Sequence, residues 1–231
     1  TAEKLGAISQ ACDEVISGEL NGHFPLVVWQ TGSGTQSNMN ANEVIANRAN
    51  QIAGKKIAHP NDDINMSQSS NDTFPTAMHI SAVTAIEDKL LPAVEGLIET
   101  FKKLEAEHEG IVKSGRTHLQ DATPIKFSQE ISGWRSSLER DAELLKLSLK
   151  PLYELALGGT AVGTGLNAPK GFSELVAKKV AELTGKPFVT AQNKFHALTS
   201  KDSFRTRRNQ GNGVRYDEDS ERRPLACIGS P

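Results

Sequence analysis

The sequence is poor in cysteine, in aromatic residues and in long apolar runs. Its two cysteines, Cys12 and Cys227, form neither a disulfide framework nor a metal-ligand spacing, which favours a reducing, intracellular compartment. Aromatic residues make up 5% of the 231 residues, a content that suits a helical protein better than a β-sandwich. No apolar run is long enough to span a bilayer, and the N-terminus lacks a signal-peptide pattern. With a formal net charge of -2, the chain gives no reason to expect nucleic acid or an anionic membrane as a partner.

Apolar residues at helical spacing predict helices over most of the chain. The pattern predicts shorter helices over residues 1–18, 40–53 and 172–184. A first long helix carries apolar residues from Ile80 to Leu104, with Pro92 expected to kink or interrupt it. A second carries them from Ile131 to Leu152. Long helices with one apolar stripe are stabilised by packing against one another, so the sequence predicts an all-α fold containing an elongated bundle.

Polar loops beside these helices are the candidate functional segments, and they cover residues 31–40, 67–73, 115–121 and 158–167. The polar stretch from His59 to Thr76 leads into the first long helix. Unsatisfied N–H groups and the helix dipole favour an anion there, so we interpret this stretch as a carboxylate-binding corner. The alternative is an N-cap followed by an ordinary surface loop.

Glycines mark two of these loops. The first has two glycines among hydroxyl residues, so its backbone could approach a ligand closely, although it lacks the ending of a Walker A loop. A flexible turn is the alternative. The four glycines within residues 157–169 indicate a loop that turns sharply and passes close to another part of the molecule. The six histidines lack metal-ligand spacing, and no serine nucleophile elbow is present.

Taken in order, these motifs resemble those of class II fumarate hydratase, a member of the aspartase/fumarase superfamily, over residues 1–202. The resemblance is carried by the segments TGSGTQSNMN (31–40), HPND (59–62), SQSSND (67–72), GRTHLQD (115–121) and GGTAVGTGLN (158–167). Thr117-His118 is similar to fumarases, whereas aspartases typically carry glutamine at the position of His118. Ser69-Ser70-Asn71 also resembles fumarases more than the Ser-Thr-Asn of aspartases.

This resemblance implies a fold with a small N-terminal helical domain over residues 1–66 and part of a long-helix bundle domain over residues 67–202. It implies the reversible hydration of fumarate to (S)-malate in the citric acid cycle, without a metal or an organic cofactor. It also implies a homotetramer in which each site draws loops from three subunits. The implied location is the cytoplasm, with the mitochondrial matrix as the alternative.

The resemblance also implies roles for individual residues. His118 is the implied catalytic residue, acting on the water that is added or lost. The implied substrate-binding residues are Ser33, Gly34, Thr35, Ser69, Ser70, Asn71 and Thr117. A second, non-catalytic anion site is implied at His59, Pro60, Asn61 and Asp62.

The resemblance stops near Asp202. Family members continue through two more core helices and a GSSxMPxKxN loop, which supplies a serine base and a substrate-binding lysine and asparagine. Residues 203–231 contain none of this, so we expect little or no hydratase activity from this chain alone. A related amine-eliminating lyase such as aspartase is one alternative. A non-catalytic helical oligomerisation module is another.

The tail, residues 203–231, is rich in arginine and lacks apolar periodicity, so we expect it to be disordered. A nucleotide sequence that can encode Asp217 to Pro231, read one nucleotide later, gives the peptide MKIANDVRWLASGP. That peptide resembles the fumarase sequence expected at this place. We therefore interpret the tail as an out-of-frame translation, which the coding nucleotide sequence would test. A genuinely rewritten or alternatively spliced tail is the alternative.

Overall fold

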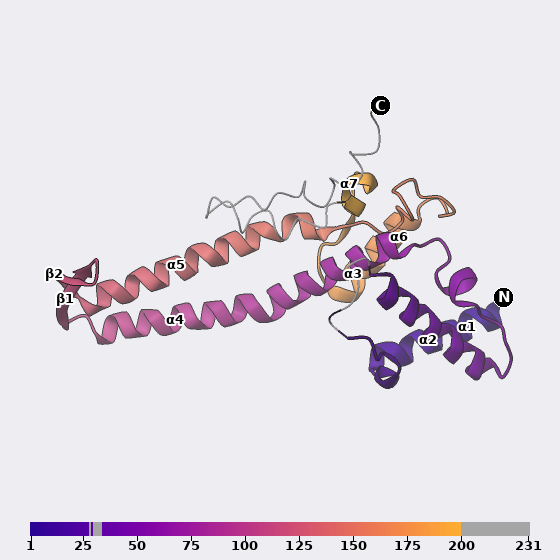
Figure 1. Ribbon diagram of the computed structural model, residues 1–231, viewed down its shortest axis with the longest axis horizontal. Helices are drawn as coiled ribbons and strands as arrows, with labels where there is room; N and C mark the ends of the chain where they lie inside the picture. Colours follow the sequence, from indigo (N-terminus) through magenta and orange to yellow (C-terminus); the bar gives the residue numbers. More distant parts are fainter. Residues whose placement is uncertain (28, 30–33, 200–231) are drawn as a thin grey trace, which may run out of the picture.

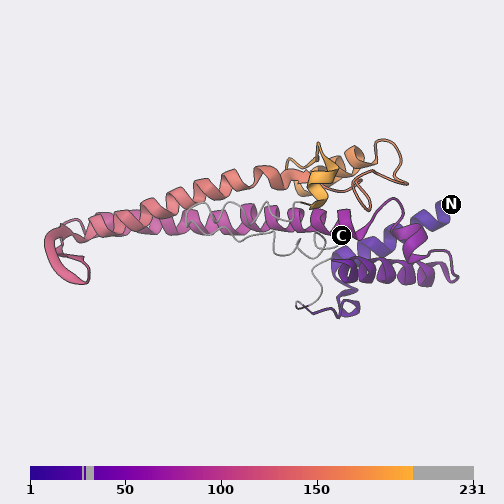
Figure 2. The same cartoon turned by 45° about the horizontal axis from the view of Figure 1, so that its top comes forward.

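Two long helices packed side by side dominate the fold (Figures 1 and 2). The computed structural model describes residues 1–27, 29 and 34–199. Helices α4 (Leu91–Glu107) and α5 (Phe127–Ser148) run in opposite directions, and a β-hairpin joins them at one end. The other helices gather at the opposite end, where the N-terminus also lies (Figure 1). The predicted all-α class is confirmed, and the predicted tail lies outside the described residues.

The first long helix is continuous from Ser70 to Glu107 except for one π-helical turn. Helix α3 (Ser70–Ala85) passes through the π turn η3 (Ile86–Leu90) into α4. The backbone N–H of Leu91 donates to the carbonyl of Ile86, the i→i−5 bond of a π turn. Pro92 follows directly, in the first turn of α4, where a missing N–H is tolerated. The interruption predicted at Pro92 is therefore a single π turn.

Most of the other helices lie where the sequence predicts them. Helix α1 (Ala2–Ser17) and helix α6 (Phe172–Thr184) closely match their predicted ranges. Helix α2 (Thr35–Ala53) begins at Thr35, well before the start predicted near residue 40. Gly34, with φ of 76°, leads the chain directly into the helix. Five polar residues of the presumed loop are therefore helical: Thr35, Gln36, Ser37, Asn38 and Asn40.

The polar turn predicted around residues 114–124 is a β-hairpin, which corrects the sequence prediction. Strands β1 (Val112–Thr117) and β2 (Gln120–Lys126) pair antiparallel, with Thr117 opposite Gln120. His118 and Leu119 form the connecting turn with φ of 50° and 64°. Positive φ at both central residues is typical of a type I′ hairpin turn. His-Leu lacks the Asn-Gly or Asp-Gly signature of that turn, so the sequence gives no local hairpin signal.

Short elements follow α5 and close the described chain. The 3₁₀ turn η4 (Lys150–Tyr153) leads into strand β3 (Glu154–Leu155), which pairs in parallel with β4 (Val189–Thr190). Helix α7 (Lys194–Thr199) comes after β4. Two further short turns lie near the N-terminal end: η1 (Asn21–His23) and η2 (Pro60–Ile64).

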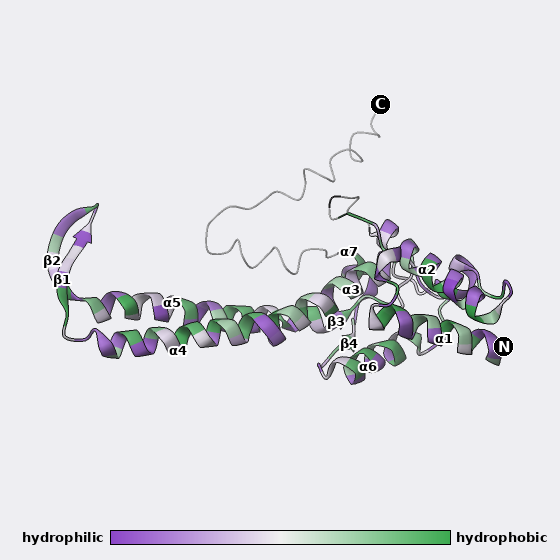
Figure 3. Ribbon diagram, turned by 90° about the horizontal axis from the view of Figure 1, so that it is seen from below, coloured by the Kyte–Doolittle hydropathy of each residue, from purple (hydrophilic) through white to green (hydrophobic). Residues whose placement is uncertain are grey.

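Buried apolar side chains form two clusters. The first lies between α1 and α2 and is rich in alanine, comprising Ala7, Ala11, Ala46, Ala49 and Ala58. The second joins α3 through α6 and comprises Val83, Ile86, Leu91, Ala142, Leu149, Leu152, Leu155, Ala177 and Phe188. Apolar and polar residues alternate around both long helices (Figure 3). The domain boundary predicted near Met66 falls between the two clusters in the sequence and stays a prediction.

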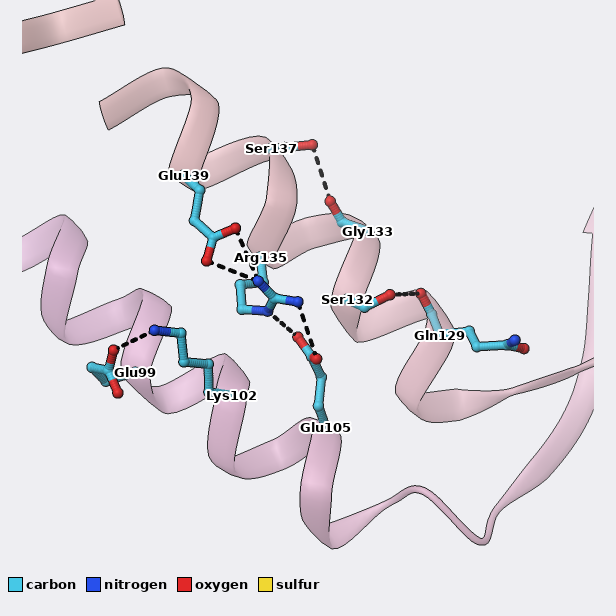
Figure 4. Close-up of polar contacts among 9 residues, drawn as sticks. All are labelled: Glu99, Lys102, Glu105, Gln129, Ser132, Gly133, Arg135, Ser137 and Glu139. Atoms are coloured by element: carbon cyan, nitrogen blue, oxygen red, sulfur yellow. Dashed lines mark hydrogen bonds and ion pairs between the residues drawn. The ribbon is translucent and has the colours of Figure 1, made fainter. Parts of the chain in front are cut away.

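An arginine fixes α5 against α4. Arg135 on α5 points toward Glu105 on α4 and toward Glu139 one turn along its own helix (Figure 4). Its Nε lies 2.5 Å from Glu105 Oε1, and its Nη1 lies 2.8 and 2.9 Å from the two Glu139 oxygens. A planar guanidinium can donate two parallel hydrogen bonds to one carboxylate, as Arg135 does to Glu105. A lysine ammonium acts as a point charge and would not select this geometry. Arg135 therefore helps to set the register of the two long helices.

A second ion cluster joins the end of α6 to the π turn. Lys186 Nζ lies 2.7 Å from one oxygen each of Glu87 and Asp88, and its side chain is 10% exposed. The Tyr153 hydroxyl donates to Glu87. Desolvation raises the pKa of Glu87, but the hydrogen bonds from Lys186 and Tyr153 outweigh it and hold this pKa below its usual value.

We expect Lys186→Met to lower the free energy of unfolding by about 2 kcal/mol at neutral pH. Because the folded-state pKa of Glu87 is depressed, this contribution is present above the unfolded-state pKa of about 4.3. It is lost as the pH falls through the folded-state pKa. The urea midpoints of variant and wild type should therefore converge as the pH is lowered. Lys179→Met, at an exposed lysine of α6, is the control and should change little; a deficit that persists in acid would contradict this account.

Candidate active site

The start of α3 carries three of the predicted substrate-binding residues. Ser69 is the N-cap, and its hydroxyl accepts from the backbone N–H of Asn71 at 3.2 Å. Asp72 completes a capping box, because its Oδ1 accepts from the N–H of Ser69 at 2.9 Å. Ser70 and Asn71 occupy the first turn. Hydroxyl, amide and N–H groups thus gather where the helix dipole favours negative charge.

Helix α2 brings a second predicted segment to this place. The hydroxyls of Thr35 and Ser70 lie 3.2 Å apart. Gly34 packs so closely on α3 that a Cβ built on it would lie 2.0 Å from Cγ of Phe74. The structure therefore places Gly34 and Thr35 beside the start of α3. Ser33, the third predicted residue of this segment, lies outside the described residues.

The glycine-rich loop, residues 158–167, covers the same helix start. The Asn71 Nδ2 donates to the carbonyl of Ala161 at 2.9 Å. The Ser67 hydroxyl donates to the carbonyl of Asn167 at 3.0 Å. The Thr160 hydroxyl is buried and finds no hydrogen-bond partner within residues 34–199. These contacts bring three of the predicted polar loops together, and we call this region the α3 corner: Gly34, Thr35, Ser69–Asn71 and the loop 158–167.

Sequence reasoning missed a polar network between α2 and α3. The Thr73 hydroxyl donates to Asn38 Oδ1 at 2.9 Å. The amide groups of Asn38 and Asn42 both donate to Asn65 Oδ1 at 3.2 Å. These residues come from separate elements, so no local sequence signal pairs them.

Asp72 was also missed as a functional candidate, although its spacing from Ser69 fits a capping box and could have been noticed. Its side chain is completely buried. Burial raises the pKa of Asp72, and hydrogen bonds from the N–H groups of Ser69, Thr160 and Gly158 act in the opposite direction. This carboxyl is therefore tied to both the helix start and the glycine-rich loop.

The predicted catalytic His118 and its neighbour Thr117 lie far from the α3 corner in the same chain. Both are exposed at the hairpin, at the opposite end of the long helices (Figure 1). The helix from Ser70 to Glu107 alone spans about 55 Å at 1.5 Å per residue. The structure therefore does not bring His118 to the residues predicted to bind substrate within one copy of the chain.

The segment predicted as a second anion site caps the turn η2. The ring nitrogen Nδ1 of His59 accepts from the N–H of Asp62 at 3.4 Å. Asp63 accepts from the N–H of His59 and pairs with Lys4 Nζ at 2.7 Å, and these hydrogen bonds hold the pKa of Asp63 below its usual value. Asp62 and Asp63 add negative charge to this turn, which works against anion binding. The site proposed for residues 59–62 stays a prediction.

The donor set of the α3 corner is hydroxyl, amide and N–H groups, which suit a carboxylate. Within residues 1–27, 29 and 34–199, no group of three or more His, Cys, Asp or Glu residues is arranged to hold a metal ion. In the same part of the chain, no helix has both the length and the apolar character needed to cross a membrane.

Residues 1–206 match the model of a lyase family, and the chain belongs to this family. It is similar to the class II fumarate hydratase of Helicobacter pylori, with 59% identity over 207 residues, covering 87% of this chain and 45% of the relative. The class II fumarate hydratase of Bacillus cereus is 59% identical over 204 residues, covering 87% of this chain and 44% of the relative. The resemblance found in the sequence is thereby confirmed.

Solved structures agree with these relatives. The class II fumarase of Schistosoma mansoni superposes with a TM-score of 0.79 at 43% identity, covering 85% of this chain and 45% of that one. A fumarate lyase:delta crystallin from Brucella melitensis, bound to cobalt, gives a TM-score of 0.81 at 38% identity over 88% of this chain and 45% of that one. The chain thus spans less than half the length of the proteins it matches.

Proposed function

We propose that this chain supplies part of the active site of a fumarate hydratase, which converts fumarate and water reversibly to (S)-malate. The observation that carries the proposal is the α3 corner, with Ser69, Ser70 and Asn71 at a helix N-terminus and Thr35 beside them. The identity of 59% to class II fumarate hydratases supports the choice of substrate. Ser33 and Thr117 are proposed as further substrate contacts.

The chemistry requires the removal of a weakly acidic proton beside a carboxylate, which produces a dianionic aci-carboxylate. Preorganised donors at the α3 corner would stabilise this charge as it develops, each by about 3 kcal/mol. His118 would act as the acid–base group for the water that is added or lost. These groups provide binding, charge stabilisation and proton transfer, so we propose a reaction without a metal or an organic cofactor.

The distance between His118 and the α3 corner implies that copies of the chain cooperate. About 55 Å separates the ends of the helix between them, so His118 of one copy would serve the corner of another. Large apolar side chains are exposed along the long helices and would be covered on assembly: Leu90, Leu97, Trp134, Leu144 and Leu147. We therefore propose a homotetramer. We also propose that residues 1–66 and 67–202 are two domain segments of each chain. A further proposal is an accessory anion site at residues 59–62. The cytoplasm is the proposed location, with the mitochondrial matrix as the alternative.

A second candidate function is an oligomerisation module without catalysis, which the same exposed apolar side chains favour. It predicts tetramers without turnover. A third is an amine-eliminating lyase related to aspartase, for which ammonia release from aspartate is the test; His118 argues against it. The loss of fumarate, followed by its ultraviolet absorbance with this chain joined to the C-terminal half of a relative such as the Helicobacter pylori fumarate hydratase, separates hydration from both.

We expect Ser70→Ala to weaken the binding of fumarate about tenfold or more, because a hydrogen bond to a charged group is lost. The Thr35 hydroxyl would also lose its neighbour at 3.2 Å. Calorimetric titration of the purified chain with fumarate measures the affinity. Ser137→Ala is the matched control. Ser137 is an exposed residue of α5, and its hydroxyl donates to the Gly133 carbonyl of the same helix. Equal affinities for wild type and Ser70→Ala would contradict the assignment of the corner.

A further inference from the structure

Two charged side chains hold the backbone between β3 and the glycine-rich loop: Asp72 from α3 and Lys194 from α7. We propose that Asp72 and Lys194 are positioning residues that clamp residues 155–160 and so fix Ala161 against Asn71 in the α3 corner. The consequence for ligand binding rests on the proposed function. The clamp itself rests on the hydrogen bonds that Asp72 and Lys194 make to the backbone.

Asp72 binds N–H groups on one side of this segment. Its Oδ2 accepts from the backbone N–H of Gly158 at 3.0 Å and of Thr160 at 2.7 Å. Its Oδ1 accepts from the N–H of Ser69 at 2.9 Å. A single carboxylate, wholly removed from solvent, thus joins the first turn of α3 to the loop.

Lys194 binds carbonyl groups of the same segment. Its Nζ lies 2.8 Å from the carbonyl oxygens of Leu155 and Leu157, and 2.5 Å from the Thr190 hydroxyl. An ammonium group has three donors, so these oxygens can use all of its hydrogen-bonding capacity. Desolvation lowers the pKa of Lys194, and the charges of Glu174 and Asp72 act against this shift.

The two contacts are complementary because they act on opposite polar groups of one short stretch of backbone. The ammonium holds the carbonyls of Leu155 and Leu157, and the carboxylate holds the N–H groups of Gly158 and Thr160. Gly158 and Thr160 have φ of 92° and 56°. A positive φ is unfavourable for a threonine by about 1–2 kcal/mol, so the surrounding contacts must maintain this conformation.

The clamped segment ends at the α3 corner. Ala161 follows Thr160 directly, and its carbonyl accepts from Asn71 Nδ2 at 2.9 Å. This bond holds the Asn71 amide with its Nδ2 toward the loop. A corner held in advance loses less entropy when it binds a ligand, so the clamp should strengthen dicarboxylate binding without contacting the ligand.

The test compares Asp72→Asn and Lys194→Met with wild type in the whole 231-residue chain. Asparagine keeps the shape of aspartate but turns an NH₂ group toward backbone N–H donors, whereas methionine keeps the stem of Lys194 without its donors. Hydrogen–deuterium exchange of peptides covering residues 155–161 should speed up about tenfold or more in both variants. The affinity for fumarate should fall about tenfold. Asp141→Asn, at an exposed aspartate of α5, is the matched control and should change neither quantity.

Comparison with the rest of the molecule separates positioning from general stability. Positioning predicts faster exchange confined to residues 155–161 in Lys194→Met, and to these residues and the first turn of α3 in Asp72→Asn. Exchange in α4 and α5 should stay unchanged, and Asp72→Glu should partly recover protection and affinity. Faster exchange throughout the chain, or unchanged exchange at residues 155–161 in both variants, would overturn the clamp. If exchange rises locally while the wild-type chain fails to bind fumarate even when joined to the C-terminal half of the Helicobacter pylori fumarate hydratase, the clamp stands and the proposed function is wrong.

Discussion

Replacing His118 by asparagine is expected to reduce fumarate hydration by about 10²–10⁴-fold, the usual contribution of a general acid–base group. The assay requires this chain joined to the C-terminal half of a relative such as the Helicobacter pylori fumarate hydratase, because the chain covers 45% of that protein. Asparagine can hydrogen-bond but cannot take up and release a proton near neutral pH. The initial rate of fumarate loss measures the effect, and the affinity for fumarate should change little.

Leu119→Ala is the matched control for His118. Leu119 occupies the next position of the same two-residue turn and is 91% exposed, with no group that transfers protons. Its replacement should leave the rate near that of the unmodified chimera. A loss of rate as large as that of His118→Asn would show that the turn, rather than the imidazole, is required.

Mixing variants tests whether copies share their sites. His118→Asn and Asn71→Ala should each be almost inactive alone. Co-produced, they should recover a measurable part of the activity, because some sites would combine a native His118 from one copy with a native Asn71 from another. Mixed assemblies that form normally but stay inactive would contradict the shared site.

Replacing Gly34 by alanine is expected to lower the free energy of unfolding by about 3 kcal/mol. The left-handed backbone contributes about 1–2 kcal/mol, since Gly34 has φ of 76°. A Cβ on residue 34 would also overlap Phe74, because it would lie 2.0 Å from Cγ and 2.6 Å from Cβ of that side chain. Overpacking of this kind costs about a further 1–3 kcal/mol. Urea unfolding measures the loss, and the displaced start of α2 should also weaken fumarate binding.

Gly54→Ala is the control at the other end of α2. Gly54 has φ of 66°, and a Cβ built on it would meet nothing within 4 Å. This variant therefore bears the backbone cost alone, about 1–2 kcal/mol. The difference between the two variants isolates the packing of Gly34 on Phe74, and equal losses would show that this contact contributes nothing.

The sequence predicted the helices best where an apolar stripe is long. The two long helices and α6 each bury one face, so apolar residues recur at helical spacing within each continuous segment. The start of α2 was predicted too late because its first turn consists of polar residues without such a stripe. The hairpin was missed because His118-Leu119 adopts a turn conformation that other residue pairs usually signal.

The candidate residues at the α3 corner were predicted from motifs, and the structure shows how those motifs meet. The capping box at Ser69 and Asp72 is local and can be identified in the sequence. The contact of Thr35 with Ser70 and the clamp formed by Asp72 and Lys194 join segments far apart in the chain. Such contacts depend on how whole helices and loops pack against one another. The spacing of residues within one segment does not reveal this packing.

The sequence by itself determined the family, the helical class and the polar segments, because these follow from motifs and periodicity within continuous stretches. Only the tertiary structure decided which of those segments meet. It placed the start of α2, the start of α3 and the glycine-rich loop together, and it placed His118 at the opposite end of the long helices. The physical reason is the rigid rise of an α-helix, which separates residues at its two ends by a distance that no side chain can span.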